Sequence, residues 1–273
     1  MKFFADTANL EEIACLNETG LLDGVTTNPT LMKKEFGEGA TKEQVHEHTY
    51  KILEIVRGPV SLEVASLTAE KMIEEGRFLS KTFNRKGCEI VIKIPISTYH
   101  PVDYGQSGPF EGVKAIRALR HEGIPVNCTL IMSPEQAVMA AKAGANYVSP
   151  FMGRLNDDAY RELEVSAEKG EHVDEALLRH FAWEKHKDIS DGARLIRETI
   201  QALQNYRFGG ILPQVLASSI RNRHDLRAAL LAGADIATMP YAVFVEAVTH
   251  PLTEAGIASF TKDAEKASKL YFS

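Results

Sequence analysis

One lysine interrupts an otherwise apolar, β-branched stretch of the chain, residues 88–96. Such a run is typical of a strand buried on both faces, and Lys93 lies two residues before the proline that ends it. Burial disfavours the charged ammonium, and the neutral amine is the form that attacks a carbonyl to make a Schiff base. A structural lysine paired with a carboxylate would occupy the same place, so this run alone leaves both interpretations open.

Polar side chains also stand at the ends of the other predicted strands. Each has a structural alternative: Asp6 suits a helix N-cap, Asn28 suits a turn, and a single arginine most often lies on the surface. Glu63 is harder to explain structurally, because a carboxylate inside a central strand needs a partner. The joint pattern of a lysine, carboxylates, hydroxyls, amides and arginines favours a catalytic site. Its candidate residues are Asp6, Thr26, Asn28, Glu63, Lys93, Asn127, Thr129, Ser149, Arg154, Ser219 and Arg221.

Predicted strands and helices alternate along the whole chain. The strands are predicted at residues 2–5, 24–29, 60–64, 88–96, 126–131, 147–149, 210–217 and 235–238, and helical patterns at 10–17, 41–57, 68–82, 110–122 and 133–143. Ser133 and Pro134 have the residue types expected at the start of a helix. Eight such units predict an α/β fold, a single (β/α)8 TIM barrel with its active site at the C-terminal ends of the strands.

The length of the chain fits one such domain with some surplus. At roughly 30 residues per βαβ unit, eight units use about 240 residues, whereas the chain has 273. We therefore predict a single domain over residues 1–273 with insertions at about 97–109 and 156–187, which would shape the substrate entrance and add one helix. A helical segment at about 251–270 would pack either on its own barrel or on a neighbouring subunit.

Composition excludes several classes of partner. The net charge is −6 with no basic block, which argues against nucleic acid or an anionic membrane as partner. No apolar stretch approaches the roughly 20 residues of a membrane span, and Asp6 comes too early for a signal peptide. Three scattered cysteines favour a reducing cytoplasm. His172, His180 and His186 lack a convincing zinc spacing, so we expect no metal site.

Eight stretches of the chain carry a family resemblance. They are residues 3–9, 24–31, 92–95, 127–130, 147–154, 217–221, 232–238 and 250–253. In this order they resemble the transaldolase and fructose-6-phosphate aldolase family of Schiff-base barrels, and most of all its short transaldolase-like members. The resemblance runs from residue 1 to about 265, apart from the two predicted insertions.

The resemblance implies a role for each candidate catalytic residue. Lys93 would form the Schiff base with the substrate ketone, and Asp6 would be the acid/base carboxylate. Glu63 and Thr129 would position a water that relays protons to and from the imine. No metal or organic cofactor is implied, because the lysine itself supplies the electrophile.

The substrate-binding residues follow from the same resemblance. Asn28 would hold the dihydroxyacetone hydroxyls, and Ser149 would lie near the bound three-carbon unit. The terminal anion would bind at Arg154, Ser219 and Arg221, because arginines make bidentate bonds to tetrahedral oxyanions. Thr26, Asn127 and Phe151 are the further candidates for substrate contact, which brings the predicted site to twelve residues.

Two positions favour transfer over simple cleavage. The aldolase branch usually has glutamine at the position of Glu63 and tyrosine at that of Phe151, and phenylalanine has no hydroxyl to protonate an enamine. We therefore predict a homo-oligomeric transaldolase that moves dihydroxyacetone from a ketose with a terminal phosphate or sulfonate, such as 6-deoxy-6-sulfofructose, to an aldehyde acceptor. Aldolase-type cleavage, an imine-free isomerase and a non-catalytic sugar-phosphate binder are the alternatives.

Overall fold

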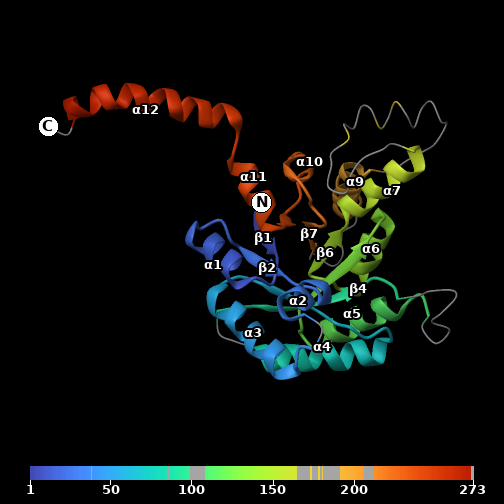
Figure 1. The fold of residues 1–273 in the computed structure, drawn as a ribbon. Helices are drawn as coiled ribbons and strands as arrows, with labels where there is room; N and C mark the ends of the chain where they lie inside the picture. The colour runs from blue at the N-terminus through green and yellow to red at the C-terminus, as the bar shows by residue number, and fades with distance from the viewer. Residues whose placement is uncertain are drawn as a thin grey trace.

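The computed structural model describes residues 1–37, 39–84, 87–98, 108–164, 173, 178, 180, 191–205 and 212–271. Eight parallel strands within this part close into a barrel, in which each strand pairs with the next and β8 pairs with β1 (Figure 1). The predicted (β/α)8 barrel is thus confirmed. The strands are β1 (Lys2–Asp6), β2 (Gly24–Thr26), β3 (Val60–Glu63), β4 (Ile90–Pro95), β5 (Val126–Ile131), β6 (Tyr147–Pro150), β7 (Gln214–Ala217) and β8 (Ile236–Met239).

Helices connect the strands and cover the outside of the barrel (Figure 1). The sequence signals at the start of one of them hold: Ser133 caps α6 by accepting from the backbone N–H of Gln136, and Gly144 ends the helix with a φ of 106°. The described helices are α1 (Leu10–Glu18), α2 (Pro29–Phe36), α3 (Lys42–Ile55), α4 (Ala69–Phe83), α5 (Glu111–His121), α6 (Pro134–Ala143), α7 (Met152–Leu163), α9 (Gly192–Asn205), α10 (Arg223–Ala232), α11 (Tyr241–Val248) and α12 (Pro251–Tyr271).

Helix α2 was not predicted from the sequence, which placed residues 24–29 in a strand and its exit. The strand ends at Thr26, and Asn28 caps the helix that follows. The helix has only eight residues and none of them is fully buried, although Leu31 and Met32 pack against the core. Its apolar pattern is therefore too short to identify a helix by periodicity. The usable signal was local: an N-cap asparagine followed directly by Pro29 at the first helical position.

The step from β6 to β7 contains two described helices. Helix α9 packs against both α6 and α10 and so occupies the outer ring, which makes α7 the additional helix of this step. The insertion that we predicted at about 156–187 therefore begins inside α7, where Ala159, Tyr160 and Leu163 are buried. The rest of that insertion lies almost wholly outside the described residues, as do residues 99–107 of the insertion predicted at 97–109.

Helix α12 extends away from the barrel (Figure 1). Its apolar residues Leu252, Ile257 and Phe260 are all exposed, so this part of the helix does not pack on its own barrel. No helix in the described ranges is both long enough and apolar enough to cross a membrane.

An apolar layer closes the lumen of the barrel below the active-site end. It consists of Phe4, Val91, Tyr147, Leu216 and Ile236. Side chains two residues apart on a strand share a face, so the next inward position on each of the same strands lies one layer nearer the C-terminal end. Those positions are all polar: Asp6, Lys93, Ser149, Ser218 and Thr238. The period of two thus places a polar layer directly above an apolar floor.

Helix α5 approaches the end of the lysine strand so closely that its second residue must be glycine. A Cβ on Gly112 would lie 1.9 Å from the carbonyl oxygen of Pro95 and 2.6 Å from that of Ile96. Both neighbours are backbone atoms and cannot move without moving β4. The position of this strand, and with it Lys93, therefore depends on the absence of a side chain at residue 112.

We predict that Gly112→Ala lowers the free energy of unfolding by about 2–3 kcal/mol, because the added methyl group overpacks a backbone contact. Urea unfolding measures the change. Gly256→Ala is the matched control, because a Cβ there has nothing within 4 Å. In the middle of α12 it should be neutral or stabilise by up to about 1 kcal/mol. Equal stability of Gly112→Ala and the unchanged protein would contradict the packing argument.

Candidate active site

A cavity of about 510 Å³ opens at the C-terminal ends of the strands. Ten of the twelve residues predicted for the site line it. The other two, Thr129 and Ser149, are fully buried and do not line it. Among the lining residues that sequence reasoning missed are Thr30 and Leu31 of α2, Leu130, Ser218 and Thr238. The ten are Asp6, Thr26, Asn28, Glu63, Lys93, Asn127, Phe151, Arg154, Ser219 and Arg221.

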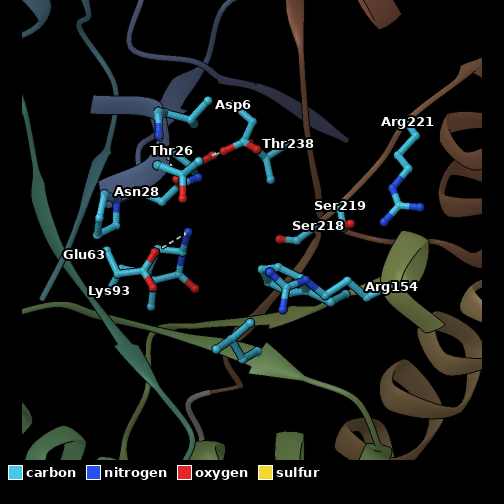
Figure 2. A pocket seen from close by; sticks show the side chains of 16 residues that line it. Asp6, Thr26, Asn28, Glu63, Lys93, Arg154, Ser218, Ser219, Arg221 and Thr238 are labelled. Atoms are coloured by element: carbon cyan, nitrogen blue, oxygen red, sulfur yellow. Dashed lines mark hydrogen bonds and ion pairs between the residues drawn. The ribbon is translucent and has the colours of Figure 1, made fainter. Parts of the chain in front are cut away.

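Lys93 and Glu63 form a buried ion pair at one side of the cavity (Figure 2). Lys93 is only 5% exposed; its Nζ lies 3.0 Å from Oε2 of Glu63 and donates to the carbonyl oxygen of Thr27 at 3.3 Å. The two residues are register partners on β3 and β4, so their side chains share a face. The carboxylate of Glu63 is therefore placed to accept the proton that the amine must lose before it attacks a carbonyl.

Asp6 belongs to a short chain of hydrogen bonds across β1, β2 and β8. The Thr26 hydroxyl donates to Oδ1 of Asp6 at 2.8 Å, and its oxygen lies 2.5 Å from the Thr238 hydroxyl. Because Thr26 has a single proton to give, Thr238 is the donor in the second bond. Thr238 ends a predicted strand, as most of the chosen candidates do. The signal that identified those candidates therefore applied to it as well.

Burial raises the pKa of Asp6 above its ordinary value of 3.8, although the positive charge of Lys93 and the hydrogen bond from Thr26 both lower it. A carboxylate with a raised pKa is a better proton acceptor, as general acid/base chemistry near neutral pH requires. The structural alternative for this residue does not hold. The N-cap of α1 is Asn9, whose Oδ1 accepts from the backbone N–H groups of Glu11 and Glu12.

Asn28 combines both of the interpretations that its sequence context allowed. Its Oδ1 accepts from the backbone N–H of Leu31 at 3.0 Å and so caps α2, while the residue also lines the cavity. The cap uses the oxygen of the amide and orients the whole side chain. An asparagine held in this way presents a fixed amide group to a ligand.

Ser149 does not line the cavity but hydrogen-bonds Asn127, which does. Its hydroxyl donates to Oδ1 of Asn127 at 2.7 Å, and Nδ2 of Asn127 donates to the Ser61 hydroxyl at 3.3 Å. These bonds fix the orientation of the Asn127 amide. Buried Thr129 is different: its hydroxyl oxygen has no hydrogen-bond partner among the described residues. Such a group is one that a water molecule satisfies.

The two predicted arginines lie across the cavity from the Lys93–Glu63 pair (Figure 2). The guanidinium of Arg154 lies 5.5 Å from the centre of the Phe151 ring, within the range of a cation–π contact. Arg221 forms a two-point ion pair with Asp157. Between the arginines, Ser219 has a φ of 61°, a left-handed conformation that a serine rarely adopts. This end of the cavity is therefore cationic.

No metal-binding arrangement is present in the described part of the chain, where no group of three or more His, Cys, Asp or Glu residues could hold an ion. Of the three histidines considered from the sequence, His180 is described and exposed, and His172 and His186 lie outside the described residues.

Comparisons with known proteins match the whole chain. Residues 3–271 match a family model described as Transaldolase/Fructose-6-phosphate aldolase. A probable transaldolase of Prosthecochloris aestuarii is 41% identical over 271 residues, covering 98% of this chain and 100% of the relative. A probable transaldolase of Aquifex aeolicus is 42% identical over 266 residues, which cover 97% of each chain. One of Syntrophobacter fumaroxidans is 40% identical over 269 residues, which cover 98% of this chain and 99% of the relative.

The raised pKa of Asp6 leads to a prediction about stability. The folded chain binds the Asp6 proton more tightly than the unfolded chain does, so stability falls as pH rises through the range that begins near 3.8 and ends at the raised pKa. Asp6→Asn removes this loss. The variant should therefore gain stability over the unchanged protein as pH rises from about 3.8, and the gain should level off once Asp6 is ionised.

Urea unfolding at a series of pH values checks this expectation. Asp158→Asn is the control for loss of one carboxylate, because Asp158 is exposed on α7 and does not line the cavity. A gain that does not change with pH would show that desolvation of the carboxylate is not its origin.

Proposed function

The chain belongs to the transaldolase/fructose-6-phosphate aldolase family, and on that premise we propose that it is a Schiff-base transaldolase. It moves a dihydroxyacetone unit from a ketose to an aldehyde acceptor. The observation that carries the proposal is one buried lysine in the cavity, with Glu63 3.0 Å from its nitrogen and a second carboxylate, Asp6, on the same lining. The names of the relatives, each a probable transaldolase, support the same activity.

Formation of the imine needs a proton acceptor beside the lysine. Glu63 takes the ammonium proton of Lys93, and the free amine adds to the C2 carbonyl of the ketose. The carbinolamine then loses its hydroxyl as water, and a protonated imine remains. The Thr129 hydroxyl, which has no hydrogen-bond partner among the described residues, lies on β5, the strand that pairs with the lysine strand. In this proposal it positions, together with Glu63, the water that carries protons to and from the imine.

Cleavage of the carbon–carbon bond assigns the base role to Asp6. Asp6 takes the proton of the C4 hydroxyl, the C3–C4 bond breaks, and its electrons move into the imine to leave an enamine on Lys93. The first aldehyde departs. The enamine then attacks the carbonyl of the acceptor aldehyde while Asp6 returns the proton to the new hydroxyl, and water releases the product ketose from Lys93. The raised pKa of Asp6 supports this role, because it must both accept and return a proton.

The shape of the site fits a ketose with an anionic end. Lys93 and Glu63 lie at one side of the cavity and Arg154 and Arg221 at the other, so a sugar with C2 at the lysine points its tail to the arginines (Figure 2). Asn28 and the Asn127–Ser149 pair supply the polar groups that hold the three-carbon unit. Ser219 completes the tail pocket beside the arginines.

Transfer is favoured over aldolase-type cleavage by the residue beside Arg154. Release of free dihydroxyacetone requires a proton on the enamine carbon, and Phe151, which lies under the Arg154 guanidinium, has no hydroxyl to give one. Without that hydroxyl one route to the protonated enamine is missing, which favours attack of the enamine on an acceptor aldehyde.

The proposed enzyme is a homo-oligomer located in the cytoplasm. The exposed apolar residues Leu252, Ile257 and Phe260 on the projecting helix α12 support a homo-oligomer in which a second copy covers them. The three scattered cysteines support a reducing, cytoplasmic location.

We predict that borohydride reduction in the presence of fructose 6-phosphate adds a reduced three-carbon unit to Lys93, detected by mass spectrometry of the digested chain. Lys93→Met should abolish the adduct and lower kcat by about 10³-fold or more. Lys114→Met is the control, because Lys114 is an exposed lysine on α5. An unmodified Lys93 together with retained activity in the variant would overturn the mechanism.

The same experiment separates the alternative classes of function. An isomerase that works without an imine would exchange substrate protons with solvent but give no trapped adduct. A sugar-phosphate binder would be stabilised by its ligand and turn nothing over.

The identity of the tail is tested by kinetics. The arginine fork binds phosphate and sulfonate oxyanions by the same bidentate geometry, so a ketose with either tail is a candidate donor. Steady-state kcat/KM values for fructose 6-phosphate and 6-deoxy-6-sulfofructose, with one acceptor aldehyde, measure the preference. A higher value for the phosphorylated ketose supports the phosphate as the natural tail. Equal values, or a clear preference for the phosphate, would exclude a dedicated sulfonate donor.

A further inference from the structure

Asp157 holds the side chain of Arg221 from outside the cavity. Each terminal nitrogen of the guanidinium bonds a different carboxylate oxygen, with Nη2 2.6 Å from Oδ2 and Nη1 bonded to Oδ1. Arg221 lines the cavity and Asp157 does not. The side chains are 18% and 44% exposed, respectively, so the aspartate is on the solvent side of the arginine. Asp157 therefore fixes the position of the Arg221 guanidinium without itself entering the cavity.

The backbone of Arg221 is held by Asp225 of α10, which in turn contacts α7. Its N–H donates to Oδ2 of buried Asp225 at 3.0 Å, and the other carboxylate oxygen of Asp225 accepts from Nδ2 of Asn156 at 3.3 Å. Asn156 and Asp157 are neighbours on α7. One dipeptide of α7 thus fixes Arg221 at two points, the backbone through Asp225 and the guanidinium directly.

Helix α7 also supplies the second arginine of the tail pocket. Arg154 lies three residues before Asp157, nearly one turn of the helix, and lines the cavity. The helix comes close to the Arg221 loop because of Gly153. A Cβ there would lie 2.2 Å from the carbonyl oxygen of Ser219 and 2.9 Å from Nε of Arg221. Contacts with α7 therefore help to set where Arg221 lies relative to Arg154.

We propose that Asp157 is a positioning residue for the anionic tail of the donor, a role that rests on the proposed function. A guanidinium has five N–H donors, and the Asp157 pair uses two of them. The other three stay available to a tail anion in the cavity. An arginine without this support would lose rotamer freedom when the anion binds, and that loss would weaken binding.

The negative charge of Asp157 has the opposite effect, because it repels an anionic tail. The gain from orienting Arg221 outweighs the repulsion of the tail, since the Asp157 carboxylate is nearly half exposed and its charge is screened by solvent. The sign of the change in KM on removing Asp157 decides between the two effects.

The test compares Asp157→Ala with Asp158→Ala. Asp158 is the next residue on the same helix; it is 51% exposed and pairs with Arg161, and it does not line the cavity. Both variants remove one carboxylate from α7. With the tailed ketose that the unchanged protein prefers, Asp157→Ala should raise KM by about tenfold and leave kcat within about twofold. With fructose, which has no charged tail, Asp157→Ala should leave both KM and kcat within about twofold of the unchanged protein. Asp158→Ala should leave both constants unchanged for either donor.

A double variant shows whether Asp157 acts through Arg221. In an Arg221→Ala background, Asp157→Ala should raise the KM of the tailed ketose no further. A fall in KM on Asp157→Ala alone would overturn the proposal by showing that repulsion dominates. An equal loss with fructose would overturn it by showing a general structural defect.

A binding measurement keeps the inference separate from the proposed reaction. Glucitol 6-phosphate has no carbonyl and cannot form an imine, so its Kd by calorimetry reports on the tail pocket alone. Weaker binding to Asp157→Ala than to Asp158→Ala supports the inference even if no ketose is turned over, in which case the proposed function fails by itself. Equal binding to both variants, or no binding to the unchanged protein, overturns the inference whatever the activity.

Discussion

The ion pair between Lys93 and Glu63 is the interaction on which the rest of the site depends. A lysine that is only 5% exposed would be costly to keep charged without a partner, and the carboxylate 3.0 Å away provides one. The pair exists because β3 and β4 are in a register that sets the two residues side by side. The end of β4 is in turn packed closely against α5, where the backbone leaves no room for a side chain at Gly112.

Inside the barrel, the side chains that form the apolar core and the polar side chains of the candidate site occupy different layers along the strands. Its lower layer is apolar and closes the lumen, and the layer two residues further along is polar and faces the cavity. Strands enforce this separation because their side chains alternate between faces. The polar layer therefore lies on a water-excluding floor, which strengthens electrostatic interactions within it. The raised pKa of Asp6 is one result of that environment.

Most of the barrel was predictable from the sequence, as were most of the polar residues that line its cavity, and the residues and helix that were missed have local causes. The lysine strand and the α6 caps were recognised because periodicity and cap residues are properties of a few neighbouring positions. Helix α2 was missed because it has only eight residues and none is fully buried, so its apolar pattern is too short to show a helical period. Thr238 was missed because threonine in a strand has an ordinary explanation, and nothing near it in sequence reveals that it faces Thr26.

The sequence by itself determined the fold class and which residue types stand at the strand ends, because both follow from short-range patterns that one strand or helix carries alone. Only the tertiary structure decided the partners. Thr26 meets a residue 212 positions away, and Arg221 meets one 64 positions away. Such pairs form only when the barrel closes and α7 settles on the loop after β7. Nothing local specifies them, because their distance in space depends on every strand between them.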